Sequence, residues 1–193
     1  MARSTFTFVG RSGAALSGHL EGPEGTPRGW AIFAHCFTCG QDSHAAVRIS
    51  RALSRAGIGV LRFDFAGTGI NGGMEGALSF ASDVEDLRAA AQAMAAAGMS
   101  PSLLVGHSLG GAAALIAATE LPDVAAVATI GAPADLQHIL RDFPASDLDA
   151  IRSEGEASVE IGGRPFVIRR SFLEAVERYD VETCIASLRR PVL

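Results

Sequence analysis

The residues best suited to chemistry form the pentapeptide Gly106–Gly110, which reads Gly-His-Ser-Leu-Gly. A serine flanked at this spacing by two glycines matches the pattern of a nucleophile elbow. Leu103 to Val105 precede it as a short strand, and a helix is expected from Leu109 to Thr119. In this setting the hydroxyl projects at the end of a strand, beside the free N–H groups of a helix N-terminus. We therefore interpret Ser108 as a nucleophile rather than an ordinary helix N-cap.

A serine hydroxyl needs a base and donors for a developing oxyanion. A second loop of interest follows the apolar run Trp30–Ala34 and reads His-Cys-Phe-Thr-Cys-Gly, residues 35–40. It ends another strand that is expected to be buried on both faces of a parallel sheet. The two loops are therefore expected at the same edge of the sheet.

Together the segments GHSLGG, AHCFTCG and RFDFAGTG resemble the α/β-hydrolase-fold serine hydrolases. The resemblance implies hydrolysis of an ester or related acyl bond, through an acyl-enzyme on Ser108, in a small-molecule acyl substrate. It implies no metal and no organic cofactor. The oxyanion would be held by the backbone N–H groups of Phe37 and Leu109, with Cys36 as the alternative to Phe37. More narrowly, the chain resembles the hydrolase half of bacterial proteins in which an α/β hydrolase is fused to an OsmC-like domain, although the loop at 67–77 departs from the expected form.

In that family the triad acid and histidine follow the cap. Pro191–Leu193 reads as the start of the acid-bearing strand, so the resemblance places neither residue within this apparently truncated chain. A catalytically silent hydrolase domain is therefore one alternative.

The five histidines offer little as a substitute base. His107 adjoins Ser108 and cannot fold back onto it, and His35 is expected to orient the oxyanion loop. His44 is the one conceivable surrogate, whereas His19 and His138 are expected to have no catalytic role.

Acidic residues near the strands and helices are interpreted as structural. Asp64 ends a strand and is expected to cap the glycine-rich loop that begins there. Three further carboxylates fit the first turn of a helix predicted over 83–97, where they interact favourably with its dipole; they are Asp83, Glu85 and Asp86. Ser82 is the expected N-cap of that helix.

Cys36 and Cys39 form a C-x-x-C between a strand and a helix, a placement that lowers thiol pKa values in redox proteins. A thiol redox protein is thus a second alternative, and zinc binding a weaker one, because a second ligand pair is lacking. All three cysteines of the chain, which are this pair and Cys184, are expected to be reduced thiols. Oxidation at Cys36 would then impair activity.

Composition excludes several classes of protein. The 193 residues are 48% hydrophobic and 19% charged, with a net charge of -5 and sixteen arginines but no lysine. Such a balance offers no electrostatic footprint for nucleic acid. Met1 to Phe8 lacks the form of a secretory leader, and the uncharged stretch Ala89–Thr119 is broken by Ser100-Pro101 and several glycines, so we expect a cytoplasmic protein without a membrane partner.

The elements that position these residues alternate along the chain. A hairpin (Thr5–Val9 and Ala15–Leu20) is followed by four strand and helix alternations, which predicts a mostly parallel α/β sheet flanked by helices, with its last strands missing. We interpret 1–193 as a single incomplete domain, with an inserted cap at 133–188 that contains a hairpin. Residues 64–76 are expected to form a loop. Val124–Ile130 would be an exposed edge strand, open to self-association.

Overall fold

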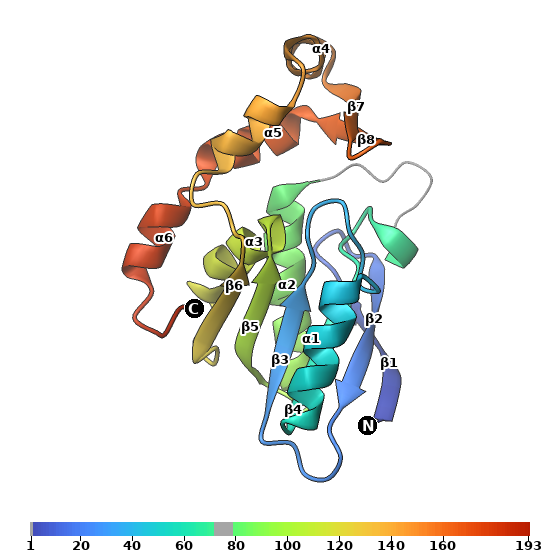
Figure 1. The fold of residues 1–193 in the computed structure, drawn as a ribbon, viewed down its shortest axis with the longest axis vertical. Coiled ribbons are helices and arrows are strands. Elements are labelled where there is room, and N and C mark those ends of the chain that lie inside the picture. Colours follow the sequence, from blue (N-terminus) through green and yellow to red (C-terminus); the bar gives the residue numbers. More distant parts are fainter. Residues whose placement is uncertain (1, 72–78) are drawn as a thin grey trace.

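The computed structural model describes residues 2–71 and 79–193, and a six-stranded sheet runs through its centre (Figure 1). The spatial order is β1-β2-β4-β3-β5-β6. β1 and β2 form an antiparallel hairpin, β2 is also antiparallel to β4, and the remaining neighbours are parallel. The strands are β1 (Ala2–Val9), β2 (Ala15–Gly22), β3 (Gly29–Ala34), β4 (Ile58–Phe63), β5 (Pro101–His107) and β6 (Ala126–Ile130). The predicted fold class is confirmed.

Helices cover both faces of this sheet because its central strands are apolar on both faces. In β3, Ala31 and Phe33 pack on the side of α1 (His44–Arg55), whereas Ile32 and Ala34 pack on the opposite side. That opposite side is covered by α2 (Phe80–Ala96) and α3 (Leu109–Ala118). Alternation along one strand therefore supplies the cores of two layers.

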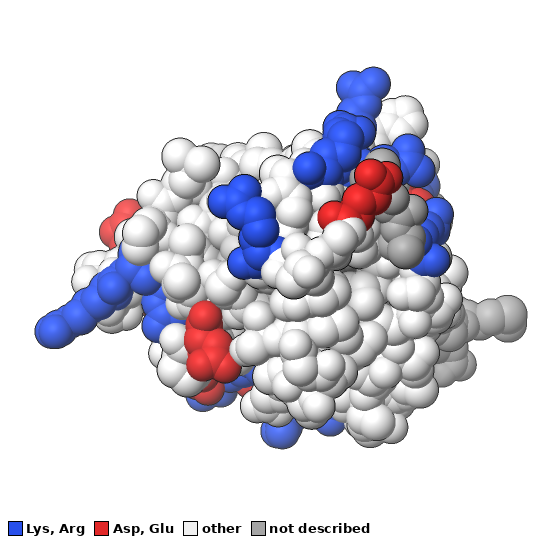
Figure 2. Space-filling view, turned by 90° about the horizontal axis from the view of Figure 1, so that it is seen from below, with Lys and Arg blue, Asp and Glu red and all other residues white. Residues whose placement is uncertain are grey.

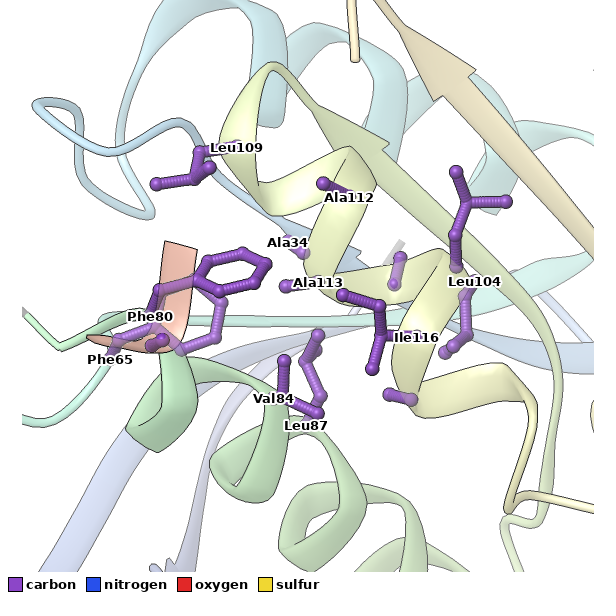
Figure 3. Packing of buried hydrophobic residues seen from close by; sticks show 14 of the residues in the cluster. Ala34, Phe65, Phe80, Val84, Leu87, Leu104, Leu109, Ala112, Ala113 and Ile116 are labelled. Atoms are coloured by element: carbon purple, nitrogen blue, oxygen red, sulfur yellow. The ribbon is translucent and has the colours of Figure 1, made fainter. Parts of the chain in front are cut away.

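The contact between α2 and α3 joins alanines with branched apolar side chains (Figure 3). Every residue of α3 is buried, and Ala113 and Ile116 face Val84 and Leu87 of α2. This close approach fixes α3, and with it the turn that precedes the helix.

The start of α2 differs from the prediction. The helix begins at Phe80, three residues before the expected start, because Ser79 rather than Ser82 is the N-cap. The Ser79 hydroxyl accepts a hydrogen bond from the Ser82 N–H at 3.3 Å. The loop predicted at 64–76 contains a 3-10 turn, η1 (Gly69–Asn71), and its residues 72–76 lie outside the described part of the chain.

A cap segment, defined as residues 133–188, rises above the carboxyl ends of the parallel strands in Figure 1. Its predicted hairpin is present, as an antiparallel pair. The final helix of the segment packs against α3 instead of lying above the sheet. The elements are η2 (Leu136–Asp142), α4 (Ala145–Glu154), β7 (Glu156–Ile161), β8 (Arg164–Arg169), α5 (Arg170–Arg178) and α6 (Val181–Ser187).

The sequence predicts an unpaired outer edge for β6, but in the structure this edge is partly paired. Val127 donates to the carbonyl of Pro191 and accepts from the N–H of Leu193, each at 3.0 Å. Residues 191–193 thus lie parallel to β6, as predicted for the start of a strand, and they cover its middle. Self-association through this edge stays a prediction.

In the view from below (Figure 2) most of the surface is uncharged, and the arginine side chains that gather at the upper right have acidic side chains beside them, so this face is not uniformly basic. Within residues 2–71 and 79–193, no helix has the length and apolar character needed to span a bilayer. The uncharged stretch Ala89–Thr119 consists of the end of α2, β5 and α3, in agreement with the interpretation from sequence.

Candidate active site

Ser108 lies at the turn between β5 and α3 in a conformation that L-residues rarely adopt. Its φ of 53° and ψ of -125° make it the one non-glycine residue with a positive φ among the described residues. Such a conformation costs about 1–3 kcal/mol and persists only where surrounding structure enforces it. The Ser108 side chain makes no capping hydrogen bond to α3. Ser108 therefore occupies the N-cap position of α3 without the side-chain hydrogen bond of an ordinary N-cap serine.

The two flanking glycines permit this turn sterically. A Cβ on Gly106 would lie 2.4 Å from the Cα of Gly111, and a Cβ on Gly110 would lie 2.2 Å from the carbonyl oxygen of His35. Both distances are far below any van der Waals contact. The close approach at Gly110 also brings the loop after β3 against the first turn of α3, so the two loops singled out in the sequence lie together.

The loop after β3 begins with a β-turn that leaves its central N–H groups free. The Cys39 N–H donates to the carbonyl of Cys36 at 3.1 Å. The N–H of Phe37, inside this turn, has no acceptor in the described part of the chain, nor has that of Leu109 at the start of α3. An oxyanion requires free N–H donors of this kind.

Cys36 and Cys39 form a disulfide in the structure, so the expectation of reduced thiols is wrong for this pair. The physical reason is the β-turn, which brings their Cα atoms to 5.2 Å, a spacing that a disulfide readily spans. Cys184 is free, and burial raises the pKa of its thiol.

Asp64 organises both this loop and the glycine-rich loop, as expected from the sequence. Its carboxylate accepts from the backbone N–H of Gln41 at 2.7 Å, from the Gln41 side chain at 3.0 Å and from the N–H of Ile70 at 3.0 Å. The side chain of Asn71 donates to the Asp64 carbonyl at 2.5 Å. Asp64 is 3% exposed, which is consistent with a structural role.

His35 supports the same loop through a hydrogen bond of its side chain. Its Nδ1 lies 2.8 Å from the carbonyl oxygen of Cys36; because a carbonyl only accepts, Nδ1 is the protonated nitrogen. Nε2 lies 3.7 Å from Asp64 Oδ1 without a hydrogen bond. Burial lowers the pKa of His35, while the hydrogen bond to Cys36 and the Asp64 charge act in the opposite direction. The ring is therefore neutral at neutral pH and orients the turn, as predicted.

A buried arginine, which the sequence analysis did not single out, completes this support. Arg62 is fully buried on β4 and donates to the carbonyl of Gln41 at 2.6 Å and to Asp42 at 2.8 Å. Its other nitrogen contacts Glu21 at 2.9 Å. The one signal in the sequence that could have indicated a role for Arg62 is its position as a charged residue inside an otherwise apolar strand.

The acidic residues of α2 divide into two kinds. Asp83 lies in the first turn, whereas Asp86 lies further along, is fully buried, and accepts from the N–H groups of Arg11 and Ala66, each at 3.0 Å. Its assignment to the helix dipole is therefore wrong, because it ties two loops together. Burial raises the pKa of Asp83 and of Asp86.

No described histidine makes a hydrogen bond to Ser108. His19 lies 3.7 Å from Asp42, and His138 lies 3.3 Å from Arg141 at an exposed position. His44 begins α1 and His107 ends β5. The described residues also contain no group of three His, Cys, Asp or Glu side chains suited to a metal.

The cap segment contacts residues 35–40, the loop expected to bind an oxyanion, at two points. The Phe37 ring packs on Phe172 of α5, with ring centroids 4.9 Å apart, and Arg164 of β8 donates to the carbonyl of Thr38. A hollow of about 410 Å³ lies between this loop and the cap hairpin, and it is lined also by Cys39 and residues 67–69. The cap thus borders the loop that would bind an oxyanion.

Comparisons with known proteins agree with the fold. The model of the alpha/beta hydrolase family matches residues 31–191. The esterase domain of a Rhodothermus marinus protein is 46% identical, with a TM-score of 0.76, over all of this chain and 75% of that one.

Two more distant structures share the fold. A serine hydrolase without a lid from Xanthomonas campestris is 26% identical, with a TM-score of 0.61, over 69% of this chain and 63% of that one. Est1E from Butyrivibrio proteoclasticus, solved with ferulic acid, is 20% identical, with a TM-score of 0.76, over 96% and 76% of the two chains. No curated protein matches the sequence.

Proposed function

Because the chain belongs to the alpha/beta hydrolase family, we propose that it is a serine hydrolase that cleaves an ester or related acyl bond through an acyl-enzyme on Ser108. The observation that carries the proposal is the Ser108 backbone, held at a positive φ between two glycines that no other residue could replace without a clash. A purely structural serine at this turn would not need the strain. The 46% identity to an esterase domain supports an ester as the substrate.

The chemistry follows from the groups around the turn. The Ser108 hydroxyl would attack the acyl carbon, and the N–H groups of Phe37 and Leu109 would stabilise the oxyanion that forms. One such donor contributes about 100- to 1,000-fold to turnover. The cap segment, through the ring of Phe37 and the contact from Arg164, would shape the pocket for the acyl or alcohol group.

A second candidate is a catalytically silent domain, and one observation favours it: no described histidine is hydrogen-bonded to Ser108. In a comparable triad, loss of the base costs on the order of a million-fold in turnover. Oxyanion stabilisation and binding would leave about a thousand-fold acceleration over water. Neither the family nor the structural relatives support the third possibility, thiol redox catalysis.

Labelling with a fluorophosphonate separates these candidates. The probe is applied to the 193-residue chain, to its Ser108→Ala variant, and to a chain extended at the C-terminus by the acid- and histidine-bearing strands of an α/β hydrolase. Labelling that requires Ser108 supports the proposal, and labelling in the extended chain alone supports a silent domain. Absence of labelling in all three chains contradicts the serine hydrolase, and labelling that survives Ser108→Ala indicates another nucleophile.

A further inference from the structure

The disulfide encloses the residue on which oxyanion binding depends. Cys36 and Cys39 bracket Phe37 and Thr38, so the covalent link and the hydrogen bond from Cys39 N–H to Cys36 O close the same four-residue turn. The free N–H of Phe37 lies within that ring. Its direction is therefore set by the geometry of the turn.

Other contacts hold the two ends of the loop more firmly than its centre. On one side, His35 Nδ1 donates to Cys36 O at 2.8 Å, and on the other Gln41 N donates to Asp64 at 2.7 Å. Between these anchors the turn has its own hydrogen bond from Cys39 N–H to Cys36 O, and the cap contacts it through Phe172 on the Phe37 ring and the exposed guanidinium of Arg164 on Thr38. The disulfide is the one covalent restraint on the centre of the turn.

The two sulfur atoms differ in their access to solvent. Cys36 is 9% exposed, whereas Cys39 is partly exposed and lines the hollow of about 410 Å³ between the loop and the cap hairpin. A small thiol entering this hollow would meet Cys39 first. Thiol–disulfide exchange depends on such access to one of the two sulfurs.

We propose that the Cys36–Cys39 disulfide is a redox switch for the oxyanion loop, closed in the active form and opened by a dithiol reductant. This inference rests on the proposed function of Ser108. A thiolate of the dithiol attacks the Cys39 sulfur, the S–S bond breaks, and Cys36 leaves as a thiolate that takes a proton. The second thiol of the reductant then displaces Cys39, so the dithiol becomes a cyclic disulfide and both cysteines become thiols. Two electrons and two protons pass to the pair.

Reduction releases the restraint on Phe37 without removing its N–H. The expected loss in the rate of Ser108 acylation is therefore several-fold, less than the roughly 100-fold that follows removal of a whole oxyanion donor. The direction is opposite to the one expected from the sequence, where oxidation of Cys36 was predicted to impair activity.

The test compares oxidised and dithiol-treated protein, in a Cys184→Ser background that leaves the pair as the sole cysteines. Non-reducing mass spectrometry establishes the state of the pair, amide hydrogen exchange follows the Cys39 N–H, and fluorophosphonate labelling follows Ser108. The Gln41 N–H, bound to Asp64, is the internal control for exchange. The labelling measurement uses whichever of the native and extended chains reacts.

We expect reduction to accelerate Cys39 exchange several-fold, leave Gln41 exchange unchanged and slow labelling, with full recovery on reoxidation. The Cys36→Ser, Cys39→Ser double variant is expected to respond to the dithiol in neither measurement. Failure of the disulfide to form, or reduction that changes neither Cys39 exchange nor labelling, overturns the switch, as does an exchange response without a labelling response. If no form is labelled, the serine hydrolase proposal fails, and the switch of its activity falls with it; the exchange measurement then reports separately on whether the disulfide holds the turn.

Discussion

The turn at Ser108, the proposed nucleophile, and residues 35–40, the proposed oxyanion loop, lie side by side, yet they are held in different ways. The turn around Ser108 is fixed by backbone packing within one short segment, where a Cβ on Gly106 would lie 2.4 Å from the Cα of Gly111. The oxyanion loop is fixed by side chains from distant parts of the chain, chiefly Asp64 and Arg62. Local steric contacts therefore determine the conformation of the Ser108 turn, and a long-range polar network determines that of the loop at residues 35–40.

The largest expected effect comes from Gly110→Ala. In an ordinary helix this change stabilises by about 1 kcal/mol, but here the new Cβ would lie 2.2 Å from His35 O, so we expect destabilisation of about 3 kcal/mol or failure to fold. Urea unfolding measures the change. Gly111→Ala is the matched control, because its nearest neighbour is the methyl group of Ala132 at 2.8 Å, and its loss should be smaller. Equal effects would show that backbone contact at Gly110 is not decisive.

Asp64→Ala tests the network that holds the oxyanion loop. It leaves the N–H groups of Gln41 and Ile70 without their acceptor, and we expect a loss of about 2–3 kcal/mol in the free energy of unfolding, with slower Ser108 labelling. Asp123→Ala, at an exposed position, is the control and should change stability by less than about 0.5 kcal/mol. Similar losses in the two variants would remove the distinction between Asp64 and a surface carboxylate.

Ser108→Gly tests the strain at the nucleophile turn. Glycine adopts a positive φ without a Cβ penalty and is also preferred to alanine at a helix N-cap, so this variant should be at least about 1 kcal/mol more stable than Ser108→Ala. Thermal or urea unfolding of the two variants gives the difference. Equal stability would mean that the turn stores no strain.

The smallest effect is a pH dependence carried by His35. Because burial lowers its pKa in the folded chain, the unfolded chain binds more protons below about pH 6.5, and the free energy of unfolding should fall as the pH is lowered through that range. His35→Asn retains a donor for Cys36 O and should flatten this slope. His19, whose pKa is also lowered, is the control: if His19→Asn flattens the slope as much, the assignment to His35 is wrong.

The features that the sequence predicts are those set by local sterics, and the features that it misses depend on contacts between distant residues. The turn at Ser108, the parallel strands and the cap hairpin were predictable, because apolar runs and glycine spacing are local signals. Arg62 and Gln41 were not, because their hydrogen bonds join residues about twenty positions apart. The disulfide was missed because the C-x-x-C spacing permits it without requiring it, and only the β-turn at Cys36 decides.

The most direct test of the central claim is peptide mapping of the fluorophosphonate adduct by mass spectrometry. The account predicts a single adduct on Ser108, absent from Ser108→Ala and formed more slowly in Asp64→Ala. An adduct on another residue, or labelling of Ser108 that does not depend on the oxyanion loop, would contradict the claim that the strained serine and the free N–H groups beside it act as one site.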